Sequence, residues 1–376
     1  MKIIFTGGGS GGHFYPIIAI VQEIRNIVKH EKLIEPQMYF LAPHPYSKGI
    51  LYDNDIVYKK IVAGKQRIYK SPLNFFDAIK TGFGIIKAVW TVFWIFPDVI
   101  FSKGGFGSFP VVVAARILRI PLIVHESDSA PGRANAWAAK FAEKIAVSYA
   151  DAGQYFAHKE RIAWTGNPIR EEIRLKAAEG GHEFMDLNSN LKTILVLGGS
   201  QGAKHINEAV IDVLPELLEK YQIIHQTGKV HFDEVTHVSK VVVPDKALQA
   251  RYKPYAYLNN VAMRVSAGIA DVVITRAGST LFEVANWGIP AIVIPITDSN
   301  GDHQRKNAFA YARAGAGVVI EENNLTPTVL KQEIDRILDD PIVSNGMIEG
   351  AKQFAKPEAA QTLATAIIDT VLRHEK

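Results

Sequence analysis

The chain opens with MKIIFTGGGSGGHFYP, Met1–Pro16, and this stretch decides how the remaining sequence is interpreted. The apolar run Lys2–Thr6 predicts a buried strand, Gly7–Gly12 predicts a glycine-rich turn, and an amphipathic helix is expected from about Phe14. A strand, a glycine loop and a helix in this order allow backbone N–H groups and a helix N-terminus to face a phosphate. The alternative is a tight turn that binds no ligand.

The same stretch matches a dinucleotide-binding fingerprint through Gly7, Gly9 and Gly12. That fingerprint also requires an acidic residue at the end of the second strand, where it holds a ribose. The second predicted strand, Met38–Leu41, continues into Ala42-Pro43-His44 and ends without a carboxylate. We therefore predict a Rossmann-like half and exclude a nicotinamide cofactor.

Composition narrows the class of protein. The 376 residues are 48% apolar, which suffices for two domains of ordinary size. The net charge of +4 comes without an RNP, zinc-finger or arginine-rich motif, so no nucleic-acid partner is expected. The absence of cysteine excludes disulfides and cysteine nucleophiles.

No secretion signal precedes the first predicted strand, and the most apolar run, Ala88–Phe96, is shorter than the ~20 residues of a membrane span. We expect a soluble or peripheral protein.

Short apolar runs alternate with helical patterns along the chain, which predicts parallel sheets with helical crossovers. The rhythm restarts after Thr165, where TILVLGGSQGAKHINEA repeats the order of strand, glycine turn and helix. Turn residues at Gly166-Asn167-Pro168 suggest the domain boundary, and a last helix is expected from about Pro357 to Arg373. The fold class predicted is α/β, with two Rossmann-like domains and a cleft between them. The predicted strands are Lys2–Thr6, Met38–Leu41, Val99–Phe101, Leu122–His125, Lys144–Val147, Thr193–Leu197, Ile223–Gln226, Ala256–Leu258, Asp271–Thr275 and Ala291–Ile296.

Polar residues in the first half gather after predicted strands. His13 closes the first glycine loop, where a helix N-terminus favours the neutral imidazole that can accept a proton. Lys103–Pro110 is a second glycine loop between a strand and a helix, and His125–Asp128 follows the next strand. The carboxyl edge of a parallel sheet is where such folds bind ligands. The alternatives are a histidine that only caps its turn, and solvated loops.

The second half shows the same placement. Gly198–Gly202 is a phosphate-type loop in which the Ser200 hydroxyl is a candidate ligand. A second turn precedes a short helix that carries Glu283, a candidate for the ribose hydroxyls, although Thr280–Glu283 also fits a capping box. Gln304 opens a later helix and is a candidate for a sugar hydroxyl. Together these residues indicate a nucleoside diphosphate held without a metal. The one D-x-D, Asp53-Asn54-Asp55, follows no predicted strand and is interpreted as a solvated turn.

An aromatic helix with a basic fringe lies between the sites of the first half. Its apolar residues and nearby cations suit a helix docked on anionic lipid, and the alternative is a crossover helix buried against the sheet. We expect the part from Trp90 onward to be buried and the part from Leu73 to Phe83 to contact the membrane. The predicted membrane contacts are Leu73, Phe75, Phe76, Ile79 and Phe83, with Lys65, Arg67, Lys70 and Lys80.

Seven motifs, in order, closely resemble the MurG family, the bacterial UDP-GlcNAc transferases that convert lipid I to lipid II in peptidoglycan synthesis. They are GGGSGGHFYP, GGFGSFP, HESDSAPGRAN, TGNPIR, GGSQGA, TRAGSTLFEVANWGIPAIVIP and DHQRKNA, between Gly7 and Ala308. The resemblance implies a GT-B fold. Acceptor binding and membrane docking are assigned to residues 1–165, joined by a last helix at about 357–376, and donor binding to residues 166–356.

The resemblance also implies roles for individual residues. Ser10, Gly11 and Gly12 match the loop near the acceptor diphosphate and donor sugar, and His13 matches a candidate general base. The matched donor-binding residues are Arg170 and Ser200 for the diphosphate, the Leu258 backbone for uracil, Glu283 for ribose and Gln304 for GlcNAc. Ser279 and Thr280 are expected at the diphosphate for a different reason, because they open a predicted helix. Several members have HEQN where this chain has HESD, which leaves the role of Asp128 at the sugar open, since an ionised carboxylate can only accept hydrogen bonds.

From these assignments we expect inverting transfer of GlcNAc by a single displacement, without a cofactor. The acceptor is the MurNAc 4-hydroxyl of lipid I, and His13, Glu126 or Asp128 removes its proton. Expected partners are UDP-GlcNAc, lipid I and an anionic phospholipid surface at the cytoplasmic face of the bacterial membrane, and the resemblance allows other cell-wall or division proteins. Alternatives are a related transferase that acts on diacylglycerol, a non-catalytic nucleotide-sugar-binding protein, and a sugar-nucleotide epimerase of the same fold.

Overall fold

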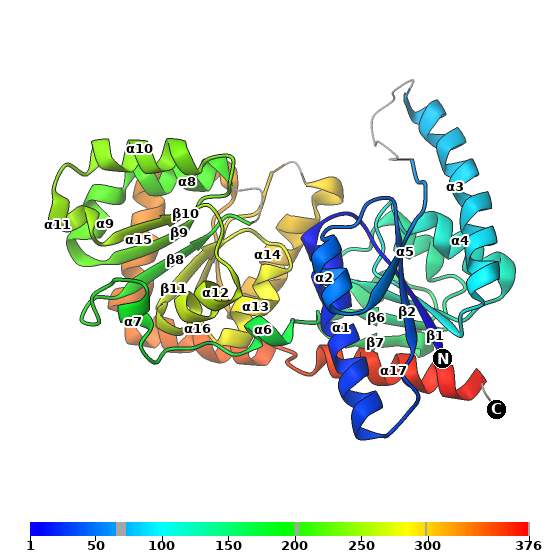
Figure 1. Cartoon of the computed structure of the whole chain (residues 1–376). Coiled ribbons are helices and arrows are strands. Elements are labelled where there is room, and N and C mark those ends of the chain that lie inside the picture. The colour runs from blue at the N-terminus through cyan, green and yellow to red at the C-terminus, as the bar shows by residue number, and fades with distance from the viewer. Residues whose placement is uncertain (65–72, 200–202, 298, 375–376) are drawn as a thin grey trace. The chain divides into compact units, whose positions relative to one another are not determined.

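The computed structural model describes residues 1–64, 73–199, 203–297 and 299–374 (Figure 1). The predicted contacts at Lys65, Arg67, Lys70 and Ser200 lie outside the described residues. The chain divides into two compact units: unit 1 comprises Met1–Arg170 and Pro357–Lys376, and unit 2 comprises Glu171–Lys356. The sequence-based division was placed after residue 165.

Unit 1 begins with the predicted strand, glycine turn and helix, and ends with a helix from the C-terminus. Its elements are β1 (Lys2–Thr6), α1 (Gly11–His30), β2 (Gln37–Ala42), α2 (Lys48–Asp53), β3 (Ile56–Lys60), α3 (Leu73–Ile95), β4 (Val99–Ser102), α4 (Phe109–Leu118), β5 (Leu122–Glu126), α5 (Arg133–Ala138), β6 (Lys144–Val147), η1 (Ala150–Tyr155), η2 (Lys159–Arg161), β7 (Ile162–Trp164) and α17 (Ala359–His374).

The described strands of unit 1 form one parallel sheet in the order β3-β2-β1-β4-β5-β6-β7. Successive residues of β1 face opposite layers. Ile3 and Phe5 pack with α1 and α17, whereas Ile4 packs with α3 and α4. A strand covered on both faces is apolar at successive positions, which explains the continuous run that marked β1 in the sequence.

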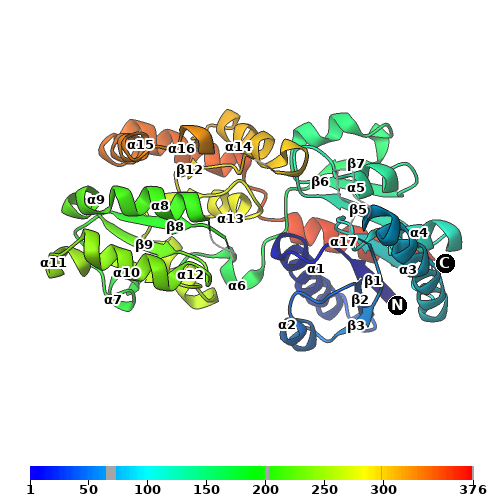
Figure 2. The same cartoon turned by 90° about the horizontal axis from the view of Figure 1, so that it is seen from above.

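Helix α17 completes the core of unit 1 although it follows unit 2 in sequence. It lies along α1 in both views (Figures 1 and 2). Leu363, Ile367 and Val371 are buried in the same cluster as the α1 side chains. Polar contacts fasten it to the sheet as well, because Lys144 Nζ donates to the Ala366 carbonyl at 3.2 Å.

Unit 2 repeats the architecture with a second parallel sheet in the order β10-β9-β8-β11-β12-β13 among its described strands. Ile194 and Val196 of its central strand pack with helices on one face. Its elements are α6 (Glu171–Arg174), α7 (Gly181–Phe184), β8 (Thr193–Leu197), α8 (Lys204–Asp212), α9 (Leu214–Lys220), β9 (Gln222–Gln226), α10 (Phe232–Val242), α11 (Lys246–Gln249), β10 (Tyr252–Tyr255), α12 (Asn260–Ile269), β11 (Val272–Thr275), α13 (Thr280–Trp287), β12 (Ala291–Val293), η3 (Asn300–Asp302), α14 (His303–Arg313), β13 (Gly317–Val319), η4 (Glu322–Asn324), α15 (Pro327–Asp339) and α16 (Pro341–Phe354).

The predicted fold class, two Rossmann-like domains with parallel sheets, is confirmed. The strand predicted at Ala256–Leu258 is wrong, because β10 ends at Tyr255 and these residues lie in the loop before α12. The strands β3, β7 and β13 were not predicted from the sequence. In the Asp53-Asn54-Asp55 segment, Asp53 ends α2 and Asn54-Asp55 form the turn that follows, where Asp55 pairs with Arg25 at 3.0 Å.

Helix α3 differs from the expectation for its second half. Trp90, Phe93 and Trp94 are 52–67% exposed, so the prediction that this part is buried is wrong. Only a narrow stripe that includes Ala88 and Val92 is buried, where α3 packs beside α4 (Figure 2). By length and composition alone, the segment Phe75–Ile95 is long and apolar enough to cross a membrane.

Helix α16 provides a matched test of the packing of unit 2. A methyl group at Gly350 would overlap the Gly315 carbonyl, whereas one at Gly346 meets nothing within 4 Å. We expect Gly350→Ala to lower the free energy of unfolding by ~1–3 kcal/mol through overpacking. Gly346→Ala should raise it by up to ~1 kcal/mol, because alanine loses less backbone entropy in a helix. Urea unfolding of both variants measures the difference, and equal stabilities would contradict the packing of α16 on the turn at Gly315.

Candidate active site

In each sheet the strand order reverses beside the first strand of the unit, and this is where open α/β sheets bind ligands. In unit 1 the reversal lies between β1 and β4, so the loops after these two strands meet. A Cβ at Gly105 would lie 2.9 Å from Gly8 Cα, and Gly105 has a φ of +82°. Glycine is therefore required for the close approach of the two loops.

His13 lies in the first turn of α1, beside these loops. Its Nδ1 is 2.7 Å from Oγ of Ser10, the residue that precedes the helix. The Nε2 atom is directed toward the second loop, because a Cβ at Gly105 would be 3.6 Å from it. When Nδ1–H donates to Ser10, the Nε2 lone pair can accept a proton. The predicted residues Ser10, Gly11, Gly12 and His13 thus occupy one helix start.

Glu126 ends β5 with both carboxylate oxygens engaged. Oε1 accepts from the Asp128 amide at 3.0 Å, and Oε2 accepts from the Gly132 amide at 3.1 Å and from Asn135 Nδ2 at 2.9 Å. Burial, followed by the charge of Asp128, raises the pKa of Glu126, and the three hydrogen bonds oppose this shift. These contacts give Glu126 the geometry of a residue that orders the loop from 127 to 132, while Asp128 is half-buried beside it.

Lys103 is a buried cation that the sequence interpretation did not single out, although it opens the second glycine loop. Its Nζ lies 2.6 Å from His125 Nδ1, 2.5 Å from Ser127 Oγ and 2.9 Å from Asn167 Oδ1. Burial lowers the pKa of Lys103, and the attraction of Glu126 and Asp128 opposes this shift and favours the charged ammonium. The sequence did show a lysine shortly after a predicted strand. It could not show the partners of this lysine, because they are 22 to 64 residues away along the chain.

In unit 2 the reversal lies between β8 and β11, and the loop after β11 leads into α13. Thr280 is not the N-cap that the capping box considered for Thr280–Glu283 requires: Ser279 is the N-cap, its side chain makes no capping hydrogen bond, and Thr280 is already helical. Glu283 is half-buried in the first turn of α13, so the three predicted residues Ser279, Thr280 and Glu283 share one helix start.

An ion-pair cluster joins four segments at this edge: the start of α8, the loops after β11 and β12, and η4. Arg276, directly after β11, donates from Nη2 to Glu322 at 2.5 Å, and His205 Nδ1 lies 2.9 Å from the same carboxylate. Glu322 also accepts from the Thr297 amide after β12 at 3.3 Å. Burial raises the pKa of Glu322, but the hydrogen bonds from Arg276 and His205 outweigh it and hold the pKa at about 2. The sequence interpretation missed this cluster because its members are far apart in the chain.

Other predicted residues take part in contacts that connect loops. Gln304 Oε1 accepts from the Ile296 amide at 3.1 Å, which ties α14 to the loop after β12. The Leu258 amide donates to Gln226 Oε1 at 2.9 Å. Arg170, at the end of unit 1, stacks on Tyr15 with its guanidinium carbon 3.7 Å from the ring centroid.

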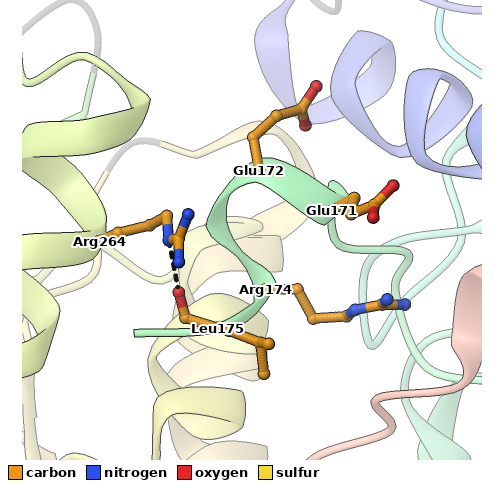
Figure 3. Close-up of a pocket in the computed structure, with 5 residues that line it drawn as sticks. All are labelled: Glu171, Glu172, Arg174, Leu175 and Arg264. Atoms are coloured by element: carbon orange, nitrogen blue, oxygen red, sulfur yellow. Dashed lines mark hydrogen bonds between the residues drawn. The ribbon is translucent and has the colours of Figure 1, made fainter. Parts of the chain in front are cut away.

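Unit 2 also contains a pocket of about 380 Å³ (Figure 3). It is lined by residues of α6 and its flank and by Arg264 of α12, whose Nε donates to the Leu175 carbonyl at 2.9 Å. None of its lining residues was predicted as a site residue. Within the described part of the chain, no three His, Cys, Asp or Glu side chains gather closely enough to hold a metal ion.

Glu322 offers a pH-dependent test of the ion-pair cluster. Its pKa in the folded state lies below the ordinary 4.5, so its contribution to stability is present above about pH 4.5 and is lost as the pH falls toward 2. We expect Glu322→Gln to lower the free energy of unfolding by ~2 kcal/mol at neutral pH, since hydrogen bonds to charged groups contribute about 1.5–3 kcal/mol. The difference from wild type should shrink in urea titrations at about pH 3.5.

The matched control is Glu349→Gln, because Glu349 is 64% exposed and forms a surface ion pair with Lys352 at 2.7 Å on α16. It should change stability by less than ~0.5 kcal/mol at either pH. A loss in Glu322→Gln that does not depend on pH would contradict the ionic origin of the stabilisation.

Comparisons with known proteins agree with this arrangement. Family models for the N-terminal and C-terminal domains of glycosyltransferase family 28 match residues 3–147 and 193–363. The chain is 37% identical to the UDP-N-acetylglucosamine–N-acetylmuramyl-(pentapeptide) pyrophosphoryl-undecaprenol N-acetylglucosamine transferase of Halothermothrix orenii, over 98% of this chain and 99% of that one. It is 32% identical to the same-named protein of Listeria monocytogenes, over 98% and 99% of the two chains.

Solved structures show the same fold. The structure of Acinetobacter baumannii MurG matches with a TM-score of 0.73 at 24% identity, over 98% of this chain and 99% of that one. A UDP-GlcNAc 2-epimerase of Neisseria meningitidis, bound to UDP-GlcNAc, matches with a TM-score of 0.69 at 14% identity, over 99% and 100% of the two chains. Because both identities are below 25%, these likenesses concern the fold.

The two domain models cover most of the chain and the relatives match its full length, which confirms the resemblance noted in the sequence. The chain belongs to the MurG family of N-acetylglucosamine transferases, within glycosyltransferase family 28.

Proposed function

We propose that this protein transfers GlcNAc from UDP-GlcNAc to the MurNAc 4-hydroxyl of lipid I, with inversion at the anomeric carbon, and so forms lipid II for peptidoglycan synthesis. The observation that carries the proposal is full-length identity of 37% to a transferase whose name states this donor and acceptor. The loops at the two sheet edges support it, because each offers a helix start and close backbone approach to a phosphorylated ligand.

Unit 2 is proposed to bind the donor. The start of α13, at Ser279 and Thr280, faces the diphosphate with its amides, and Glu283 in the same turn accepts bonds from the ribose hydroxyls. Leu258 offers its backbone to the uracil and Gln304 its amide to the sugar. Ser200 is a further proposed contact of the diphosphate, and so is Arg170, although Arg170 belongs to unit 1.

Unit 1 is proposed to bind the acceptor at the loop that carries Ser10, Gly11 and Gly12. His13 is the proposed general base, because its Nε2 lies beside the glycine loops where an acceptor hydroxyl would approach. Asp128 is the second candidate. The three N–H donors on Glu126 favour an ordering role for that carboxylate.

The apolar face of α3 supports docking at the cytoplasmic face of the membrane, where a lipid-linked acceptor resides. Exposed Lys80 and Lys87 lie on the same helix and complement anionic lipid. Because Ala88 and Val92 pack inside unit 1, the proposed mode is peripheral contact by the outer side of the helix. The apolar face comprises Phe75, Phe76, Ile79, Phe83, Ile86, Trp90, Phe93 and Trp94, which are 46–68% exposed.

The decisive experiment is transfer of labelled GlcNAc from UDP-GlcNAc to a short-chain lipid I analogue, with diacylglycerol and no-acceptor arms. Product with the lipid I analogue alone is the expected result. Product only with diacylglycerol would move the acceptor to the related lipid transferases. Epimerised donor in the no-acceptor arm, or donor binding without turnover by folded protein, would overturn the transferase proposal.

The same transfer assay tests whether His13 is the general base. A general base contributes about 10²–10⁴ in rate, so His13→Ala should lower kcat by at least ~10² while the KM for UDP-GlcNAc changes little. Near-wild-type turnover would remove His13 from this role and leave Asp128.

Membrane docking is tested by flotation with vesicles that contain anionic phospholipid. We expect wild type to float at low salt and Phe83→Ser/Trp90→Ser to float at least ~10-fold less, because each lost side chain contributes about 1.5–3 kcal/mol on burial. The control, Val230→Ser/Ile342→Ser, removes apolar residues of unit 2 that are 80% and 84% exposed, and it should float like wild type. Wild-type protein that stays in the dense fraction would contradict docking.

A further inference from the structure

Lys103 is the one lysine that is buried within the described residues, with 1% of its surface exposed. It directly follows β4, beside the strand reversal of unit 1. Burial of an ammonium group costs free energy unless hydrogen bonds and opposite charges compensate. The partners of the Lys103 ammonium therefore indicate the function of its charge.

The three protons of the ammonium group match its three acceptors. Ser127 Oγ and Asn167 Oδ1 accept two of them, and His125 Nδ1 accepts the third. His125 can do so because its Nε2 lies 2.9 Å from the Gly166 carbonyl, to which it donates. Burial and the neighbouring Lys103 both lower the pKa of His125, which keeps this ring neutral.

These contacts join three segments at the carboxyl edge of the sheet. Lys103 directly follows β4, His125 lies near the end of β5 with Ser127 directly after the strand, and Asn167 lies in the segment after β7. Gly104 follows the lysine directly and is packed on Asn135, since a Cβ at Gly104 would lie 2.5 Å from its side-chain nitrogen. The contacts of Lys103 therefore fix the start of the second glycine loop.

The charge of Lys103 also has partners. Glu126 and Asp128 both attract it, and Asp128 in turn raises the pKa of Glu126. The titratable and charged groups that act on the cluster are His125 and Glu126 of β5, Asp128 of the following loop, and His13 of α1. Two carboxylates next to the proposed base therefore act electrostatically on one buried cation.

We propose that Lys103 is a positioning residue for the transfer reaction: its buried ammonium ties together the ends of β4, β5 and β7 and balances the charges of Glu126 and Asp128, which holds residues 125–128 in the arrangement that the acceptor site requires. The proposal rests on the proposed function, and it adds a residue that does not itself contact the reacting atoms.

The test is the pH dependence of transfer to the lipid I analogue in Lys103→Met. Without the cation the neighbouring carboxylates bind protons more readily, so the acid limb of the kcat profile should move up by ~1 pH unit. We expect kcat to fall ~10²-fold, as for the loss of one preorganised electrostatic group, and the KM for UDP-GlcNAc to change less than about twofold. Lys144→Met, which removes a lysine bonded to a backbone carbonyl elsewhere in unit 1, should behave like wild type.

Asp128→Asn supplies an independent readout. When this carboxylate is neutral, the cluster needs less positive charge, so Lys103→Met should cost at least ~10-fold less in the Asp128→Asn background than in wild type. Multiplicative losses, or an unmoved acid limb in folded Lys103→Met, would overturn the proposal. If Lys103→Met does not fold, Lys103→Gln retains a hydrogen-bond donor without the charge and is subject to the same criteria.

The outcomes distinguish the role of Lys103 from the proposed function of the protein. Wild type that transfers GlcNAc, together with an unshifted Lys103 variant, overturns the role of Lys103 and leaves the proposed function in place. Inactive, folded wild type overturns both.

Discussion

The structure depends on the burial of parallel strands on both faces. Central strands such as β1 and β8 have helices on either side. Their side chains therefore form the core and cannot contact a substrate. Polar groups must then gather at the carboxyl edge, where each strand runs into a loop and a helix start. Both units follow this constraint, and the candidate residues His13, Glu126 and Glu283 all lie at such positions.

The two sheets stabilise this edge in the same way. Lys103 is the first residue after β4 and Arg276 is the first after β11, and each strand lies beside the central strand at the reversal of its sheet. Each cation is nearly buried and is held by acceptors from neighbouring loops, which in unit 2 include the carboxylate of Glu322. A cation at this point draws together segments that the sheet itself leaves unconnected. The two units therefore share their glycine loops and also a nearly buried cation directly after the strand beside the reversal.

The sequence predicted the central strands well and the edge strands poorly. The three unpredicted strands β3, β7 and β13 and the misplaced β10 are the four outer strands of the two described sheets. An edge strand is exposed on one side, so residues such as Val57 and Trp164 remain accessible and the continuous apolar pattern is lost.

Motif residues at helix starts could be predicted from the neighbouring sequence alone. The contacts of Lys103 and Arg276 could not, because they depend on which loops the sheet order brings together. The exposure of Trp90 and Trp94 reversed the usual expectation for aromatic residues, since apolar periodicity does not distinguish a core from a lipid surface.

The position of α17 sets an order of events during synthesis. Translation proceeds from the N-terminus, so the strands of unit 1 and the helix α1 leave the ribosome before any residue of unit 2. Leu363, Ile367 and Val371, which cover α1 in the finished core, follow only after all of unit 2. A nascent chain therefore carries an uncovered apolar strip on its first domain while the second domain is made, a surface of the kind that favours aggregation and engages chaperones. The domain that is translated first is the one whose folding finishes last.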